Sequence, residues 1–157
     1  MGSKRVGLAR TQALIENLKR DLQMNGSTIQ GAERQVIRLT GAGASQALTS
    51  KDSGALVVMA GADASTITLP AVQAGAEFEV FAFTAFNHVV NGGDSLIYGG
   101  IYDNQNDSSD TNVDRSAVNA ASSITLQNAA VGDCLTFISD GTNWYVKGWL
   151  NDTPSVS

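Results

Sequence analysis

The sequence predicts a mainly β protein, a jelly-roll-like β-sandwich or barrel, preceded by an arm with one helix. From residue 35 onward, short runs of β-branched and aromatic residues alternate with clusters of Gly, Asn, Asp and Ser. Only 11–24 has a helical pattern, so the strand–helix alternation of a parallel α/β sheet is missing. The 157 residues suffice for one domain and an arm. We expect the arm at 1–38, the β domain at 39–151 and a tail at 152–157.

The predicted helix at 11–24 contains neither Gly nor Pro and is rich in good helix formers. Asn25 and Gly26 end it, because Gly accepts the left-handed conformation of a helix cap. An apolar stripe has a seven-residue period and is widened by neighbouring leucines: Leu8, Ile15 and Leu22, with Leu14 and Leu18. A repeat this short does not form a coiled coil alone. The helix therefore lies on its own domain, or packs against other copies or a partner.

Charge is divided unevenly along the chain. Residues 1–38 hold seven cations and three anions, a net charge of +4, and residues 39–157 hold three cations and twelve carboxylates, a net charge of −9. A basic arm suits nucleic acid or an acidic protein surface. The arm has no aromatic side chain for base stacking and the body repels phosphates, so we do not expect nucleic acid. The alternative is that these charges are simply solvated.

Strand-like runs fill the rest of the chain, and a polar stretch at 99–121 is predicted to be a long exposed loop. Asp140-Gly141 predicts a tight hairpin turn. It is followed by three aromatics, Trp144, Tyr145 and Trp149, which are more typical of core closure than of a binding face. The predicted strands are 35–40, 54–60, 65–69, 76–86, 88–90, 96–98, 123–127, 133–139 and 144–150.

An internal repeat with an offset of 57 residues links 64–75 (ASTITLPAVQAG) to 121–132 (ASSITLQNAAVG). In each copy an alternating strand leads through a polar turn, closed by Gly, into a hydrophobic strand. This pattern predicts two equivalent hairpins that face each other across a sandwich. Chance similarity between two hairpins is the alternative.

Residues that suggest chemistry lack the partners that the chemistry needs. Residues 93–96 spell GDSL, an esterase signature, but Ser95 needs a base, and the only histidine, His88, lies upstream. We therefore expect no enzyme, and His88 to be a partly buried strand residue. Asp103 and Asp114 match the ends of a calcium-binding loop, but position 6 is Ser108 instead of Gly and no helices flank it. An EF-hand is excluded, and an irregular cation site stays open.

The remaining composition excludes several classes of protein. A single cysteine, Cys134, excludes a disulfide framework and the usual Cys-rich zinc sites. Its alternation with Thr136 and Ile138 predicts a small core side chain. No apolar run is long enough for a membrane span, and no hydrophobic region follows the basic N-terminus as in a signal peptide. We expect no cofactor, metal or membrane partner.

A resemblance to a family is visible in four motifs taken in order. They are LTSKDSG at 48–54, ITLP at 67–70, AGAEF at 74–78 and SDGTNWYV at 139–146. Together they resemble a module of tailed-bacteriophage virion proteins and cover about residues 48–150. The N-terminal segment, KRVGLARTQALIENLKRDL, is similar to virion structural proteins of marine cyanobacterial phages.

The resemblance implies a non-enzymatic structural protein of the virion, usually a homotrimer. A single short module with one arm favours a decoration, or cement, protein on the capsid surface over a tail fibre, spike or receptor-binding tip, which remains the alternative. The expected partners are other copies of the chain and the major capsid protein. The residues expected to contact the capsid all lie in the arm: Lys4, Arg5, Arg10, Leu14, Ile15, Leu18, Lys19 and Arg20.

Overall fold

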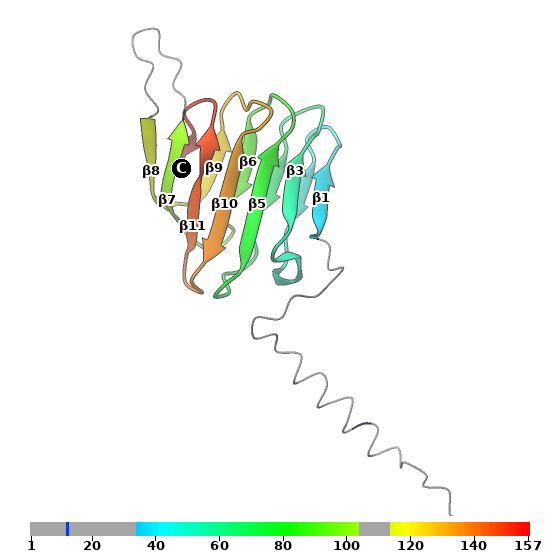
Figure 1. The fold of residues 1–157 in the computed structure, drawn as a ribbon, viewed down its shortest axis with the longest axis vertical. Helices are drawn as coiled ribbons and strands as arrows, with labels where there is room; N and C mark the ends of the chain where they lie inside the picture. Colours follow the sequence, from blue (N-terminus) through cyan, green and yellow to red (C-terminus); the bar gives the residue numbers. More distant parts are fainter. Residues whose placement is uncertain (1–11, 13–33, 104–113) are drawn as a thin grey trace, which may run out of the picture. The chain divides into compact units, whose positions relative to one another are not determined.

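The computed structural model describes Gln12, residues 34–103 and residues 114–157. The chain divides into two compact units, Met1–Glu33 and Arg34–Ser157. The predicted helix at 11–24 lies outside the described residues apart from Gln12, which is helical. The second unit is a sandwich of two β-sheets (Figure 1), so the prediction of a mainly β domain is confirmed.

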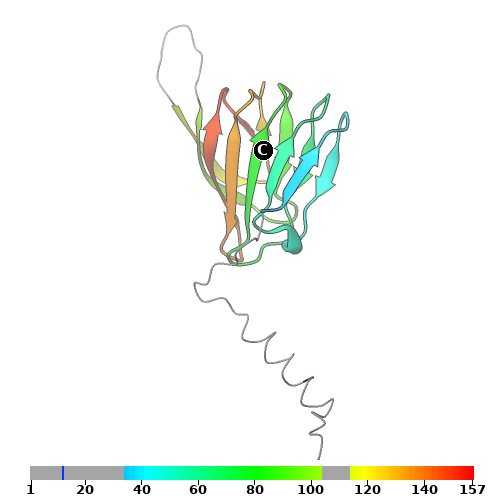
Figure 2. The same cartoon turned by 45° about the vertical axis from the view of Figure 1, so that its right-hand side comes forward.

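The larger sheet has seven strands and the smaller has five (Figure 2). In spatial order, the larger sheet contains β1 (Val36–Leu39), β3 (Leu56–Met59), β5 (Glu77–Ala82), β10 (Cys134–Ser139), β11 (Trp144–Leu150), β7 (Ile97–Asp103) and β8 (Asp114–Ala121). The smaller sheet contains β12 (Ser155–Val156), β9 (Ser123–Leu126), β6 (His88–Asn91), β4 (Thr66–Thr68) and β2 (Ser45–Ala47). One 3-10 turn, η1 (Ser50–Asp52), precedes β3.

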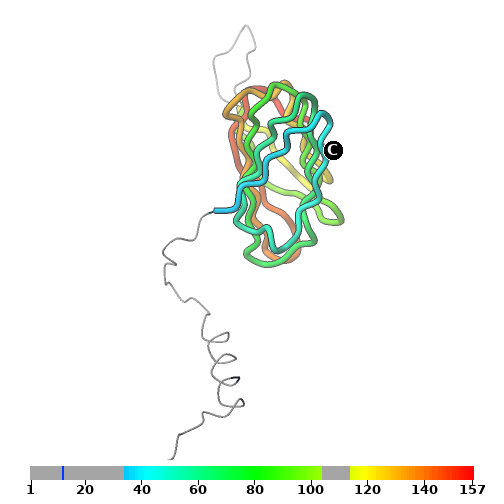
Figure 3. The backbone as a smooth tube through the Cα atoms, turned by 90° about the vertical axis from the view of Figure 1, so that its right-hand side faces the viewer, coloured from blue at the N-terminus to red at the C-terminus, as the bar shows by residue number. Residues whose placement is uncertain are grey.

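From β1 to β7 the chain crosses from one sheet to the other after every strand, as the tube in Figure 3 shows. Strands β1, β3 and β5 consequently run parallel in the larger sheet, and β2, β4 and β6 run parallel in the smaller one. The jelly roll, by contrast, is an antiparallel architecture. The predicted sandwich is therefore present, but its first half is wound like a solenoid.

The core lies between the two sheets. Strand β5 alternates buried and more exposed side chains, as expected for a strand with one buried face. The largest fully buried side chains include Trp144, Phe78 and Phe137, and the rings of Phe78 and Trp144 lie 5.7 Å apart. Burial of each such side chain contributes about 1.5–3 kcal/mol.

The internal repeat forms two β-arches and not two facing hairpins, so that prediction was wrong. In each copy the first strand, β4 or β9, lies in the smaller sheet, and the second, β5 or β10, lies in the larger sheet. The second strands pair antiparallel, with Phe137 opposite Phe78 and Leu135 opposite Val80. The chain crosses between the sheets because the apolar residues of both strands can then meet in one core, which a hairpin within one sheet does not allow.

Two further predictions were wrong. Most of the predicted loop at 99–121 belongs to β7 and β8, and residues of the predicted tail at 152–157 form β12, which pairs with β9. Gly99 and Gly100 lack strand propensity, but pairing with β11 on one side and β8 on the other holds them extended. The two-residue β12 carries no alternation that could have revealed it. Among the described residues, no helix is long and apolar enough to cross a membrane.

Candidate interaction surface

The two outer faces of the sandwich differ in chemistry. On the smaller sheet, the half-buried positions between core residues are small hydroxyl side chains: Thr66, Thr68, Ser123 and Thr125. On the larger sheet they include large aromatic and charged side chains. This second face is the candidate functional site of the described domain.

Two aromatic pairs stand on the outer face of β7 and β11. Tyr102 stacks on Trp149 with ring centroids 4.9 Å apart and an angle of 23° between the planes. Tyr98 lies beside Tyr145 with centroids 6.4 Å apart. The pairs form because β7 and β11 run parallel in a register that places Tyr98 opposite Tyr145 and Tyr102 opposite Trp149. Trp149 is 59% exposed, an unusual surface cost for a residue that normally buries its ring.

A cationic row separates the two aromatic pairs. Lys147 lies between Tyr145 and Trp149 on β11 and is opposite Gly100 on β7. Gly100 has no side chain, and the guanidinium of Arg115 from β8 occupies the space above it. Within residues 34–103 and 114–157, neither Lys147 nor Arg115 has an ion-pair partner. We call these two cations and the four aromatic residues the platform.

The carboxylates around the platform are already engaged. Glu79, two strands away from Lys147 in the same row, forms a salt bridge with Arg34. Asp140 accepts hydrogen bonds from the backbone amides of Asn143 and Thr142 and from the Tyr145 hydroxyl. These donors lower the pKa of Asp140, the Asn143 amide most strongly, and the same hydrogen bond raises the pKa of Tyr145. The platform is thus negative only at its Tyr145 end and positive in its middle.

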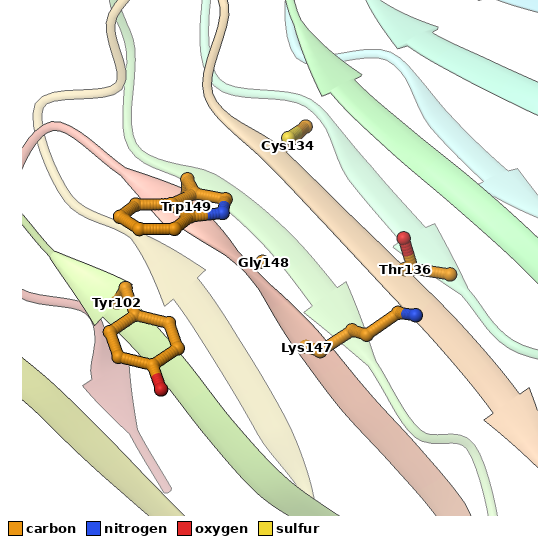
Figure 4. Close-up of a pocket in the computed structure, with 6 residues that line it drawn as sticks. All are labelled: Tyr102, Cys134, Thr136, Lys147, Gly148 and Trp149. Atoms are coloured by element: carbon orange, nitrogen blue, oxygen red, sulfur yellow. The ribbon is translucent and has the colours of Figure 1, made fainter.

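A depression of about 350 Å³ lies beside Trp149. It is lined by Tyr102, Cys134, Thr136, Lys147, Gly148 and Trp149, and Lys147 extends towards Thr136 on β10 (Figure 4). Its volume lies at the low end of the range for small-molecule pockets. The depression therefore offers an aromatic ring, an ammonium group and a hydroxyl group to a single ligand.

The structure corrects two predictions about this region. Cys134 is not a core side chain, since it faces outward with Thr136 and Ile138 while Leu135 and Phe137 face the core. Only Trp144 of the three late aromatics is in the core, and Tyr145 and Trp149 are exposed. The spacing Tyr145-x-Lys147-x-Trp149 carried the missed signal, because positions i, i+2 and i+4 of a strand share one face.

The residues that suggested catalysis have structural roles. His88 is fully buried, whereas partial burial was predicted. Its Nδ1 accepts a hydrogen bond from the Ser65 amide at 3.0 Å, and its Nε2 lies 3.0 Å from the Thr84 carbonyl oxygen. Ser95 lies in the turn after β6, where its amide donates to the Gly92 carbonyl. Both ring nitrogens of His88 are thus committed to the backbone and are not available to activate Ser95.

Among the described residues, no group of three or more His, Cys, Asp or Glu side chains is arranged to hold a metal. Asp103 is buried, with Oδ2 accepting a hydrogen bond from Ser116 at 2.6 Å. The residues predicted to contact the capsid lie outside the described residues: Lys4, Arg5, Arg10, Leu14, Ile15, Leu18, Lys19 and Arg20. Comparisons of the chain with protein-family models, curated proteins and solved structures find no significant match.

Proposed function

We propose that this protein is a non-enzymatic structural component of a tailed-phage virion, a homotrimeric decoration protein that bridges and stabilises major capsid protein subunits. The observation that carries the proposal is the division of the chain into an N-terminal unit and a separate β-sandwich. The division nearly coincides with the change from basic to acidic sequence. One part can then grip a partner while the other remains outside.

The proposed mechanism is additional contact area between capsid subunits. Packaged DNA pushes the subunits apart, and a trimer that spans their junctions adds contacts that must break first. Each arm contributes little alone, but three linked arms bind with a high effective concentration. Arm cations suit acidic capsid loops, and the acidic body, facing outward, keeps virions from adhering to one another.

The structure of His88 supports the non-enzymatic part of the proposal. The only imidazole of the chain is hydrogen-bonded within the core. Nucleophilic catalysis by Ser95 would require it, or another base, within hydrogen-bond reach. We expect Ser95→Ala to leave the function intact.

The test adds purified protein to undecorated phage heads and measures binding by sedimentation. The intact chain should bind as a trimer, and a chain lacking residues 1–26 should not. A matched pair of variants separates specific contact from general charge: charge reversal at Lys4, Arg5 and Arg10 should abolish binding, whereas Lys51→Glu in the body should not. Equal binding of the truncated and intact chains would refute the arm as the grip.

The exposed platform is the one feature that favours the alternative, a tail fibre, spike or receptor-binding tip, because such proteins need a recognition surface on a rigid sheet. The same preparation distinguishes the two roles. Protein that fails to bind heads but labels tails or host cells would support the alternative.

A further inference from the structure

We propose that the platform is a binding site for an acidic oligosaccharide, one that carries carboxylate or sulfate groups on some of its rings. This inference does not depend on a position on the head or tail of a virion. It follows from the chemistry of the outer face of β7, β8 and β11.

The aromatic pairs match the apolar side of a sugar ring. One face of many pyranose rings presents C–H groups, which carry a weak positive charge and are attracted to the negative face of an aromatic ring. Trp149 and Tyr102 are 59% and 42% exposed, so their rings are available to such a ligand. The second pair, Tyr98 and Tyr145, lies four residues along the same two strands, which suits successive rings of an oligosaccharide.

The cationic row matches the acidic groups. Lys147 and Arg115 have no carboxylate partner among the described residues, and Glu79 is occupied by Arg34. A ligand carboxylate above Gly100 would meet both cations, and the guanidinium can bind it through two parallel hydrogen bonds. Asp140 repels anions at the Tyr145 end, so the acidic group belongs in the middle of the platform or beside Trp149.

The depression beside Trp149 matches the hydroxyl groups. Thr136 supplies a hydroxyl that donates and accepts, and Lys147 supplies an ammonium that donates. A purely apolar ligand would leave these groups without partners. A sugar unit offers apolar C–H groups and several hydroxyls at once, which is the mixture that this surface presents.

Polynucleotides and a second copy of the chain suit the platform less well. A polynucleotide carries a charge on every unit, and the domain at 39–157 has three cations against twelve carboxylates. A second copy would bring its own Lys147 and Arg115 against these two cations in a symmetric contact. Sugar rings with an acid group on only some units avoid both repulsions.

The experiment measures binding of hyaluronan oligosaccharides to the full chain by isothermal titration calorimetry. Hyaluronan alternates an acidic and a neutral sugar, and chitin oligosaccharides serve as the neutral comparison. We expect hyaluronan to bind more tightly than chitin oligosaccharides, and the difference to shrink as salt is added. Binding should also quench the fluorescence of Trp149.

Variants separate stacking from charge recognition. Trp149→Ala should weaken binding of both sugars at least about tenfold. Lys147→Ala should remove the preference for the acidic sugar and leave neutral binding almost unchanged. Gly100→Ala should act like Lys147→Ala, since the new methyl group displaces the guanidinium of Arg115. The controls are Phe83→Ala, an exposed aromatic residue beside Arg38 outside the platform, and Lys51→Ala, and both should bind normally.

Three results would overturn the proposal. Hyaluronan that does not bind at millimolar concentration would exclude it. A short oligo-dT strand that binds more tightly than hyaluronan, and loses binding in Trp149→Ala, would make the platform a nucleic-acid site. A Trp149→Ala chain that becomes monomeric in light scattering, without a change in sugar binding, would make it a subunit contact.

Discussion

Gly75 and Gly132, 57 residues apart, occupy the same position in two copies of one β-arch. The Gly75 amide donates to the Ser139 carbonyl at 2.8 Å, and the Gly132 amide donates to the Ala82 carbonyl at 3.2 Å. Adding 57 to Gly75 and subtracting it from Ser139 turns the first bond into the second. The antiparallel pairing of β5 and β10 obeys the same exchange. The sequence repeat therefore folds with a local two-fold relationship between its halves.

The two glycines should be equally sensitive to substitution. Both have positive φ values, 82° and 110°, in open space, so a Cβ would add backbone strain without a collision. We expect Gly75→Ala and Gly132→Ala each to lower the free energy of unfolding by about 1–2 kcal/mol in urea titrations. Gly41→Ala, where the new methyl group meets only ordinary contacts, should change it by less than about 0.5 kcal/mol. A cost at only one of the two sites would contradict their equivalence.

The stability of the domain should decrease as the pH falls below neutrality, because of His88. Burial lowers the pKa of His88 below its ordinary value of 6.5. Above pH 6.5 the ring is neutral in both states. Below it, the unfolded chain binds a proton that the native state refuses, so the unfolding free energy falls by at most about 1.4 kcal/mol per pH unit, until the native pKa is reached.

Urea titrations between pH 8 and pH 5 measure this effect. In His88→Gln the slope between pH 6.5 and the native pKa should disappear, although the variant is less stable throughout. The carboxylates titrate mostly at lower pH, so they do not mask the result. The same slope in wild type and His88→Gln would show that another group is responsible.

Asp133 should be the most costly surface-proximal carboxylate to remove. It is 6% exposed, and its two oxygens accept the amides of Ala130 at 3.0 Å and Asn151 at 2.9 Å. Desolvation raises its pKa in spite of these donors. Asp133→Ala leaves two amides without their acceptor and should cost about 1–3 kcal/mol. Asp133→Asn should recover part of that loss, and Asp94→Ala, at an exposed turn position, should cost almost nothing.

The two tryptophans should differ sharply in fluorescence. Trp144 is fully buried and Trp149 is 59% exposed. In Trp149→Phe, the remaining emission should be blue-shifted and nearly insensitive to acrylamide. In Trp144→Phe, the emission should be red-shifted and strongly quenched, and the chain should be less stable because Phe78 loses its ring contact. Equal quenching in the two variants would contradict the assignment of Trp149 to the surface.

Local signals in the sequence determined much of the fold. Asp140-Gly141 predicts the turn that joins β10 to β11, because turn chemistry depends on neighbouring residues alone. Alternation along residues 77–82 predicts β5 and its buried face for the same reason. The repeat at 64–75 and 121–132 predicts two equivalent units. Each of these features is settled within about a dozen residues.

Only the tertiary structure decided which face of a strand is inside. In β10 one face carries Cys134 and Ile138 and the other carries Leu135 and Phe137, and both are apolar enough for a core. In β11 both faces carry a tryptophan. The choice depends on the partner strand: pairing with β5 turns Phe137 inward beside Phe78, and pairing with β7 brings Tyr102 to Trp149. These partners are distant in sequence, so the platform exists only in the folded chain.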